Sequence, residues 1–273
     1  MSKRKAKLGP LAFLSLVREV RRGSGDPRPL AVAGARELVP LLARELRAGG
    51  ETPAVVEGSV EDAAVLVWIG APDEEVLHEA SRNGVPIVAV TEAETVPYVL
   101  ATDLVRVPPG AGFPVAEIAA AVARRLGEDG TSLAARLPVL RSAVCDELIR
   151  SFSKRNAIIA AAVFVPGIDM PVLTLNQARL VLRIALAYGQ PVDNTRGAEL
   201  LGVVGAGFGF RAVARELLDF VPVAGWAVKS AVAYAGTKAV GEAAVRYFEA
   251  RAPNAPFAPA RTPRLLRRRR SRR

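Results

Sequence analysis

The chain is poor in the side chains that build most metal and covalent catalytic sites. It has one cysteine, Cys145, and one histidine, His78, among 273 residues. A single thiol excludes an intramolecular disulfide and a cysteine-rich zinc site, and a single imidazole excludes a zinc site with several histidines. A serine–histidine–aspartate triad could use only His78 as its base. We expect His78 to be a solvent-facing helix residue and Cys145 to be a small apolar residue on a helix.

Acidic residues are nearly absent from both ends of the chain. Residues 251–273 hold nine arginines and no acid, and residues 1–25 hold seven lysines and arginines against one acid. The net charge of +10 therefore leaves −5 on residues 26–250. Folded nucleic-acid-binding domains carry a basic face, which this body would lack.

Basic ends have three interpretations. They suit anionic lipid headgroups, they bind nucleic acid without sequence preference, or they only solubilise the chain. We take lipid as the main candidate, with nucleic acid as a partner of the tail alone. The candidate lipid contacts are Arg267, Arg268, Arg269 and Arg270.

The sequence also lacks a long uninterrupted apolar run. Residues 8–17 are uncharged, but ten residues are too few to span a bilayer, and no small-residue cleavage site follows. Residues 156–178 contain only one charge, Asp169, but Pro166 and Pro171 interrupt them. The sequence therefore does not decide whether the protein spans, lies on or avoids a membrane. For residues 1–25 it predicts a basic amphipathic helix, bound to a membrane, a partner or the protein's own body.

The body is rich enough in apolar residues for a buried core, at 51% of the chain. Between residues 26 and 130, apolar runs typical of buried strands alternate with amphipathic helical stretches. The runs occupy residues 29–35, 52–58, 63–71, 85–92 and 103–110. This alternation predicts an α/β domain with a mostly parallel sheet and helices on its faces.

Residues 131–250 change to helical periodicity, which predicts a following all-α domain, and residues 251–273 form a Pro- and Arg-rich segment that we expect to be disordered. One expected helix covers residues 133–155, with Leu137, Leu140, Val144 and Leu148 on one stripe. Thr174 and Gln177 fit a capping box that would open the next helix.

A glycine-rich segment, "GVVGAGFGFR" at residues 202–211, raises the question of a phosphate site. A dinucleotide fingerprint would need glycine where Phe210 stands, and a Walker loop would need Lys and Ser/Thr after Gly207. The preceding residues are typical of a helix, not of a strand. We therefore interpret the small residues as helix-packing surfaces. The candidate packing residues are Gly202, Gly205, Gly209, Ala227, Ala231, Ala235 and Ala239.

Residues 169–248 resemble a bacterial domain of unknown function that accompanies Era-like GTPases and also occurs in predicted inner-membrane proteins. The matching stretches include "DMPVLTLNQARLVLRIALAYG" and "ELLGVVGAGFGFRAVARELLDFVPVAGW", followed by "AVAYAGTKAVGEAAVRYF". The most specific parts are residues 205–215 and "PVAGW". The resemblance implies membrane association and a link to GTPases, and it brings no catalytic residues.

The front half resembles a P-loop GTPase domain whose nucleotide site is degenerate. Gly34 follows the first strand, but Val39, Pro40 and Leu41 stand where glycine, lysine and Ser/Thr would be. Without the lysine and hydroxyl, the phosphates and magnesium lose their ligands. In the guanine-recognition segment, only Glu94 could supply a carboxylate. A flavodoxin-like or Rossmann-like domain without a nucleotide is the alternative origin.

These features predict a non-enzymatic, membrane-associated protein at the cytoplasmic side of a bacterial membrane, without a cofactor or metal. A GTPase-like α/β scaffold would bind a partner protein, with a GTPase as one option. Two alternatives stay open. A nucleotide-binding enzyme or sensor would use Gly34 and Gly70, and a cytoplasmic nucleic-acid-associated protein would use the tail. The sequence does not indicate the oligomeric state.

Overall fold

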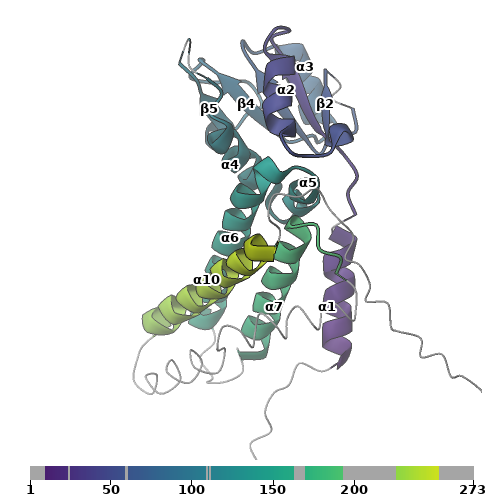
Figure 1. Ribbon diagram of the computed structural model, residues 1–273. Helices are drawn as coiled ribbons and strands as arrows, with labels where there is room; N and C mark the ends of the chain where they lie inside the picture. The colour runs from purple at the N-terminus through teal and green to yellow at the C-terminus, as the bar shows by residue number, and fades with distance from the viewer. Residues whose placement is uncertain are drawn as a thin grey trace, which may run out of the picture.

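The computed structural model describes residues 10–23, 25–58, 61–108, 110, 112–162, 170–192 and 226–251. A parallel sheet with flanking helices forms one end of the molecule and a group of packed helices forms the other (Figure 1). The predicted fold class is confirmed.

The sheet has the strand order β2-β1-β3-β4-β5, and every neighbouring pair is parallel. This is the flavodoxin-like doubly wound order. The strands are β1 (Leu30–Gly34), β2 (Val55–Glu57), β3 (Val65–Ile69), β4 (Ile87–Thr91) and β5 (Leu104–Arg106). Short 3-10 turns, η1 (Thr52–Ala54) and η2 (Ala101–Asp103), precede the two edge strands.

Alternate side chains of each strand enter two separate cores. Leu30 and Val32 of β1 pack in the core formed with α2 (Val39–Arg47) and α4 (Val115–Leu126). Ala31 and Ala33 face the opposite core, formed with α3 (Glu74–Arg82). Helices cover both faces, which explains why the strands are continuous apolar runs in the sequence.

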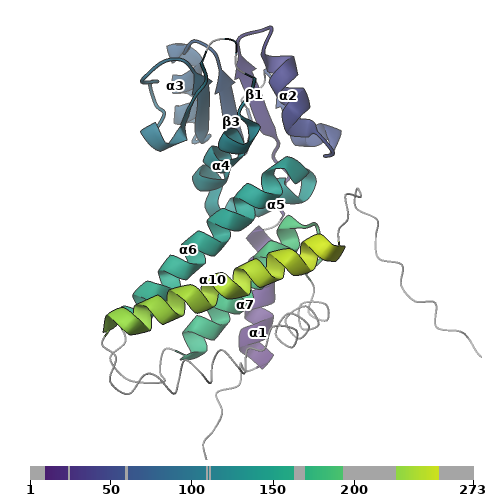
Figure 2. The same cartoon turned by 60° about the vertical axis from the view of Figure 1, so that its left-hand side comes forward.

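The helical half combines the N-terminal helix with the elements that directly follow α4. It contains α1 (Pro10–Gly23), η3 (Gly127–Asp129), α5 (Gly130–Arg136), η4 (Pro138–Leu140), α6 (Arg141–Ala162), α7 (Met170–Ala187) and α10 (Trp226–Arg251). α10 lies across α6 and α7 (Figure 2). The core under α2 and α4 continues without a break into this half, because one cluster joins Leu46, Ile118, Leu148 and Leu182.

Two expected helix boundaries were wrong. The four residues of the predicted stripe, Leu137, Leu140, Val144 and Leu148, are all buried. However, they do not share one helix, because Pro138 starts a separate turn and α6 begins only at Arg141. The next helix begins at Met170 and not at Thr174, because a first helical turn tolerates Pro171. Gln177 therefore does not close a capping box; its side chain amide donates to Thr237 Oγ1 at 3.3 Å.

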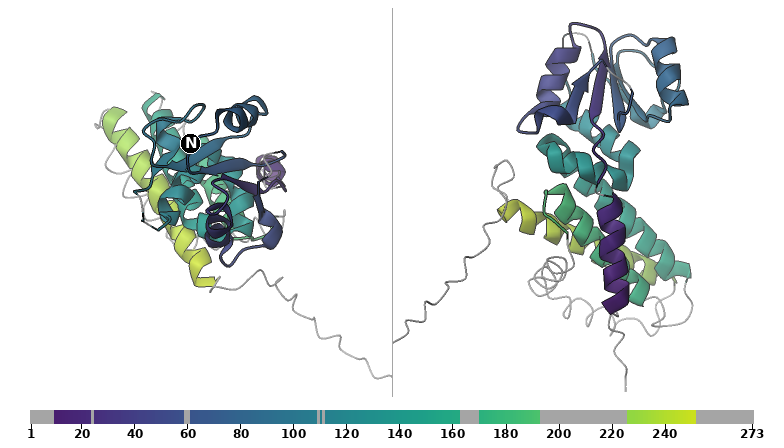
Figure 3. Two further views of the ribbon diagram at one scale, coloured as in Figure 1. Left: turned by 90° about the horizontal axis from the view of Figure 1, so that it is seen from above. Right: turned by 90° about the vertical axis from the view of Figure 1, so that its right-hand side faces the viewer.

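The N-terminal helix docks on the protein's own body. Leu16, Val17 and Val20 of α1 are at most 2% exposed, and α1 packs against α7. Glu19 adds an ion pair with Arg179 at 2.7 Å. The right-hand view of Figure 3 shows α1 alongside the helical half, below the sheet. The apolar side chains described in α1 are thus occupied within the chain.

Four helices are joined by a chain of polar side chains. Asn156 of α6 donates to Thr237 Oγ1 of α10 at 2.8 Å and accepts from Asn176 of α7 at 2.9 Å. Arg179 donates to Asn176 Oδ1 at 2.9 Å and reaches Glu19 of α1. Asn156 and Thr237 are fully buried, so these bonds are needed to offset their desolvation.

Close approach of α10 to α6 depends on a glycine. A Cβ at Gly241 would lie 2.5 Å from Ile149 Cγ1 and 3.2 Å from Leu180 Cδ2, whereas a Cβ at Gly236 would meet nothing within 4 Å. Helix α10 therefore contacts α6 and α7 through the Gly241 face, where an added Cβ would require the Ile149 side chain or the helices to shift.

This difference predicts opposite effects of two alanine substitutions on one helix. Gly241→Ala should lower the free energy of unfolding by about 1–3 kcal/mol because of overpacking. Gly236→Ala should raise it by up to about 1 kcal/mol, since alanine is the better helix former. Urea denaturation of both variants measures the difference. Equal stability of the two variants would contradict the contact.

Candidate functional site

A cleft of about 630 Å³ lies at the carboxyl edge of the sheet, where open α/β sheets bind ligands. The chain segments that follow β3, β4 and β5 form most of it. Its described lining consists of Leu38, Ile69, Gly70, Ala71, Pro72, Val90, Thr91, Glu92, Ala93, Val107, Pro108, Gly110 and Phe113. Apolar groups dominate this lining, and Glu92 is its only charged side chain.

The crevice between β1 and β3 is closed by backbone. Ala35 N donates to Ile69 O at 2.8 Å. Gly34 has φ +125°, and a Cβ there would lie 2.0 Å from Ile69 O; a Cβ on Gly70 would lie 2.9 Å from Ala35 Cβ. Gly34, the predicted start of a phosphate loop, thus allows the ends of β1 and β3 to approach closely. The cleft lies on the β3 side of this contact.

The N-terminus of α3 at this edge is a poor anion site. Asp73 caps α3 by accepting from Glu75 N at 3.1 Å and Val76 N at 3.3 Å, and the first turn carries Glu74 and Glu75. These carboxylates already occupy the positions at which a helix would attract phosphate. Pro40 removes one N–H from the first turn of α2.

The residues compared with guanine-recognition positions have local structural roles. Thr91 is 5% exposed, and its Oγ1 accepts from Ala93 N at 3.2 Å, which shapes the turn after β4. Glu92 is exposed and lines the cleft, whereas Glu94 is not among the lining residues. The backbone carbonyl of Glu94 accepts from Arg106 at 3.5 Å. This geometry favours an apolar or uncharged ligand, or one with a cationic group near Glu92.

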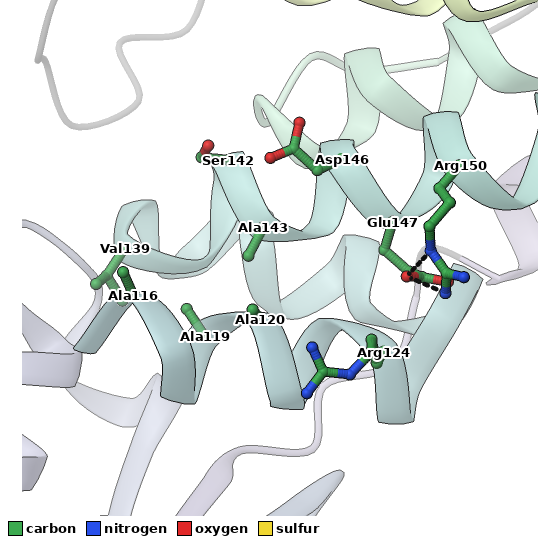
Figure 4. A pocket seen from close by; sticks show the side chains of 10 residues that line it. All are labelled: Ala116, Ala119, Ala120, Arg124, Val139, Ser142, Ala143, Asp146, Glu147 and Arg150. Carbon is green, nitrogen blue, oxygen red and sulfur yellow. Dashed lines mark hydrogen bonds and ion pairs between the residues drawn. The ribbon is translucent and has the colours of Figure 1, made fainter. Parts of the chain in front are cut away.

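A second concavity, a groove of about 380 Å³, runs between α4 and α6 (Figure 4). Its floor has small side chains, and its rims carry two carboxylates and two arginines. The lining residues are Ala116, Ala119, Ala120, Arg124, Val139, Ser142, Ala143, Asp146, Glu147 and Arg150. Glu147 and Arg150 pair at 2.6 Å, and Arg124 donates to Thr102 O at 2.6 Å. We call this the α4–α6 groove.

Asp146 is the groove carboxylate whose neighbours are acidic. Burial raises its pKa above the usual range, and the negative charges of Glu242 and Glu249 on α10 raise it further. Nearby Cys145 is buried, and burial raises the pKa of its thiol to about 12. The thiol therefore stays protonated at neutral pH and is a poor nucleophile, as expected for a packing residue. His78 is exposed on α3, with its ring stacked on Tyr98.

The predicted packing residues fall in two groups. Gly202, Gly205 and Gly209 lie outside the described residues, so their role stays a prediction. The four candidate packing alanines lie on α10, and all four are exposed: Ala227, Ala231, Ala235 and Ala239.

The buried face of α10 is instead the one with Thr237, Gly241, Ala244 and Phe248. A spacing of four residues drifts around a helix with 3.6 residues per turn, which explains the offset of the alanines. The candidate lipid contacts from Arg267 to Arg270 lie outside the described part of the chain.

Sequence reasoning missed the apolar end of the helical half. The hydrogen-bonded residues Asn156, Asn176 and Thr237 mark its boundary. The residues of α6 that follow Asn156 and the residues of α7 and α10 that precede Asn176 and Thr237 all lie on the same side of this boundary. We define the apolar end as residues 157–162, 170–175 and 226–236, where Lys229 is the only charged residue. It lies opposite the sheet (Figure 1). The sequence shows that these stretches are nearly uncharged, but it does not show that they come together in space.

A comparison with known proteins finds a weak similarity. Magnetosome membrane protein 22 of Magnetospirillum gryphiswaldense is 29% identical over 118 residues, which cover 40% of this chain and 60% of that protein. The chain thus covers less than two thirds of its relative's length. No family model and no solved structure matches the chain, so its likeness to a GTPase-associated domain stays a prediction.

The cleft geometry predicts negligible nucleotide affinity. GTP, ATP and NAD should each bind with a Kd weaker than about 1 mM, which corresponds to less than about 4 kcal/mol of binding free energy. Isothermal titration calorimetry of the full chain with magnesium present measures this. A micromolar Kd for any of them would restore the nucleotide-binding interpretation.

The raised pKa of Asp146 predicts a pH-dependent destabilisation. Because its folded-state pKa lies above the unfolded value, the unfavourable charge is present above the folded pKa and is relieved as the pH falls through it. Asp146→Asn should raise the Tm at pH 7 by less than about 2 °C, since the site is partly solvated. The gain should shrink toward pH 4. Glu79→Gln, an exposed carboxylate change on α3, is the control, and an equal effect in both variants would contradict the assignment.

Proposed function

We propose that this chain is a non-enzymatic, membrane-associated protein that touches the bilayer with its apolar end and binds a partner with its α/β domain. The observation that carries the proposal is the apolar end itself. Ile158, Val172 and Val228 are 68%, 46% and 46% exposed, and they come from the three helices that meet there. Clusters of exposed apolar residues of this kind mark protein or membrane contacts.

The size of the apolar end supports shallow insertion. Residues 226–236 of α10 rise by about 16 Å, and residues 157–162 of α6 by about 9 Å. A hydrocarbon core of about 30 Å is twice as thick. Among the described helices, none combines the length and hydropathy required to cross a bilayer. We therefore infer contact with one leaflet, like that of interfacial helices.

The basic ends of the sequence would add an electrostatic contribution. Each Arg near an anionic bilayer surface contributes about 1 kcal/mol. Arg267, Arg268, Arg269 and Arg270 would then bind lipid phosphates at the cytoplasmic side of a bacterial membrane. The likeness to a magnetosome membrane protein agrees with membrane association and does not bear on the side.

The cleft at the carboxyl edge is the partner site in this proposal. It lies at the end of the molecule opposite the apolar end, so a membrane-bound molecule would present it to the cytoplasm. Its apolar lining and the N-terminus of α3, which is already capped by Asp73, suit a protein segment better than a phosphorylated metabolite. A GTPase remains one candidate for that partner, on the sequence resemblance alone.

Vesicle flotation tests the membrane contact. The full chain should float with vesicles that contain anionic lipid. Ile158→Asn with Val228→Asn should lower its partition coefficient at least about tenfold, because each inserted side chain contributes about 1.5 kcal/mol or more. Replacing Arg267 to Arg270 with Gln should lower binding by a similar factor on anionic vesicles only.

A matched control separates the apolar end from general surface hydrophobicity. Leu41→Asn with Leu100→Asn alters two side chains of the α/β domain that are 44% and 57% exposed. This control should float like the unmodified chain. A full chain that stays unbound at low salt, or equal loss in both double variants, would overturn the proposal.

A further inference from the structure

The cleft at the carboxyl edge of the sheet is apolar inside and has acidic flanks. Glu92, exposed in the turn after β4, is the only charged residue of its described lining, which contains no lysine or arginine. The segments after β3 and β4 carry four more exposed carboxylates, beside the lining residues Pro72 and Ala93. These carboxylates are Asp73, Glu74, Glu75 and Glu94.

The arginines that flank the lining segments do not cancel this charge. Arg106, at the end of β5, donates to the Glu94 carbonyl at 3.5 Å, and Arg36 has Glu37 beside it in the chain. The dipole of α3 offsets part of the charge at its own first turn, but Glu92 and Glu94 lie in the turn after β4, outside that helix. A cleft with apolar walls and one sign of charge concentrates counter-charged partners.

The lining favours a protein segment over a small polar molecule. Small-molecule sites fix their ligand with a few buried polar groups. Here the hydroxyl of Thr91, the buried polar side chain of the described lining, already accepts from Ala93 N at 3.2 Å. The apolar part of the lining includes Ile69, Val90 and Phe113, which can contact an inserted apolar side chain. An occupant that combines such a side chain with a cation matches both the walls and the flanks.

We propose that the cleft binds a basic segment of a partner protein, with an apolar side chain inside the cleft and a lysine or arginine paired with Glu92. This inference rests on the proposed function, because it names the chemistry of the partner that the α/β domain binds. The apolar contact supplies most of the affinity. The carboxylates set the specificity, since they speed the approach of basic segments and reject acidic segments and nucleic acid.

Selection from a random peptide library on the immobilised full chain tests the proposal. The enriched peptides should carry Lys or Arg close to Leu, Ile, Phe or Met. Fluorescence anisotropy at low salt then measures the Kd of a selected peptide. Glu92→Lys, a change at an exposed residue, should raise this Kd at least about fivefold, because it replaces attraction with repulsion. Glu79→Lys, the same charge reversal at an exposed residue of α3 that does not line the cleft, should change it less than about twofold.

Ala71→Trp separates this inference from the partner site of the proposed function. It fills the cleft at an exposed lining residue without a charge change and should also raise the Kd at least about fivefold. Enriched peptides that are acidic or uncharged, but sensitive to Ala71→Trp, would overturn the inference and leave the cleft as a partner site. No enrichment, or binding insensitive to Ala71→Trp, would overturn both.

Self-association of the full chain that Ala71→Trp abolishes would assign the cleft to a second copy, and it would also overturn the inference. Analytical ultracentrifugation of the two chains measures this. Because no lipid is present in these experiments, their outcome is separate from that of vesicle flotation.

Discussion

The arrangement of the two halves depends on the charge pairing of Glu128 in η3. Arg183 of α7 is only 6% exposed; its Nε lies 2.7 Å from Glu128 Oε2, and its Nη1 donates to the Glu128 carbonyl at 3.1 Å. Arg155 of α6 binds the other oxygen of the same carboxylate. A buried guanidinium without its carboxylate would cost several kcal/mol. Since η3 follows α4 directly, this pairing fixes the orientation of the sheet relative to α6 and α7.

That fixed orientation gives the molecule two unlike ends. The carboxyl edge of the sheet carries the cleft, and the far ends of α6, α7 and α10 carry exposed apolar side chains. The buried bonds of Asn156 and Thr237 lie at the boundary between the charged part of the helical half and its apolar end. The proposed function uses this polarity: one end meets lipid and the other is presented to a partner.

The sheet has the topology of many nucleotide-binding folds but different chemistry at its edge. Gly34 and Gly70 bring two strand ends into contact, where other doubly wound sheets leave room for a ligand. Asp73 occupies the free N–H groups of α3. Fold alone therefore does not indicate an enzyme, and the function has to be argued from the sites.

The sequence by itself determined the strands, most helices and the charge distribution, because buried strands are continuous apolar runs and packed helices keep their period. It also predicted a degenerate phosphate loop at Val39, Pro40 and Leu41, which stays a prediction. It misplaced the face of α10, since nothing local distinguishes the exposed alanines from Gly241; only the contact with Ile149 does. The apolar end, the α4–α6 groove and the pairing of Glu128 with Arg183 join residues far apart in the chain. Tertiary structure alone decided them, because each depends on which helices become neighbours.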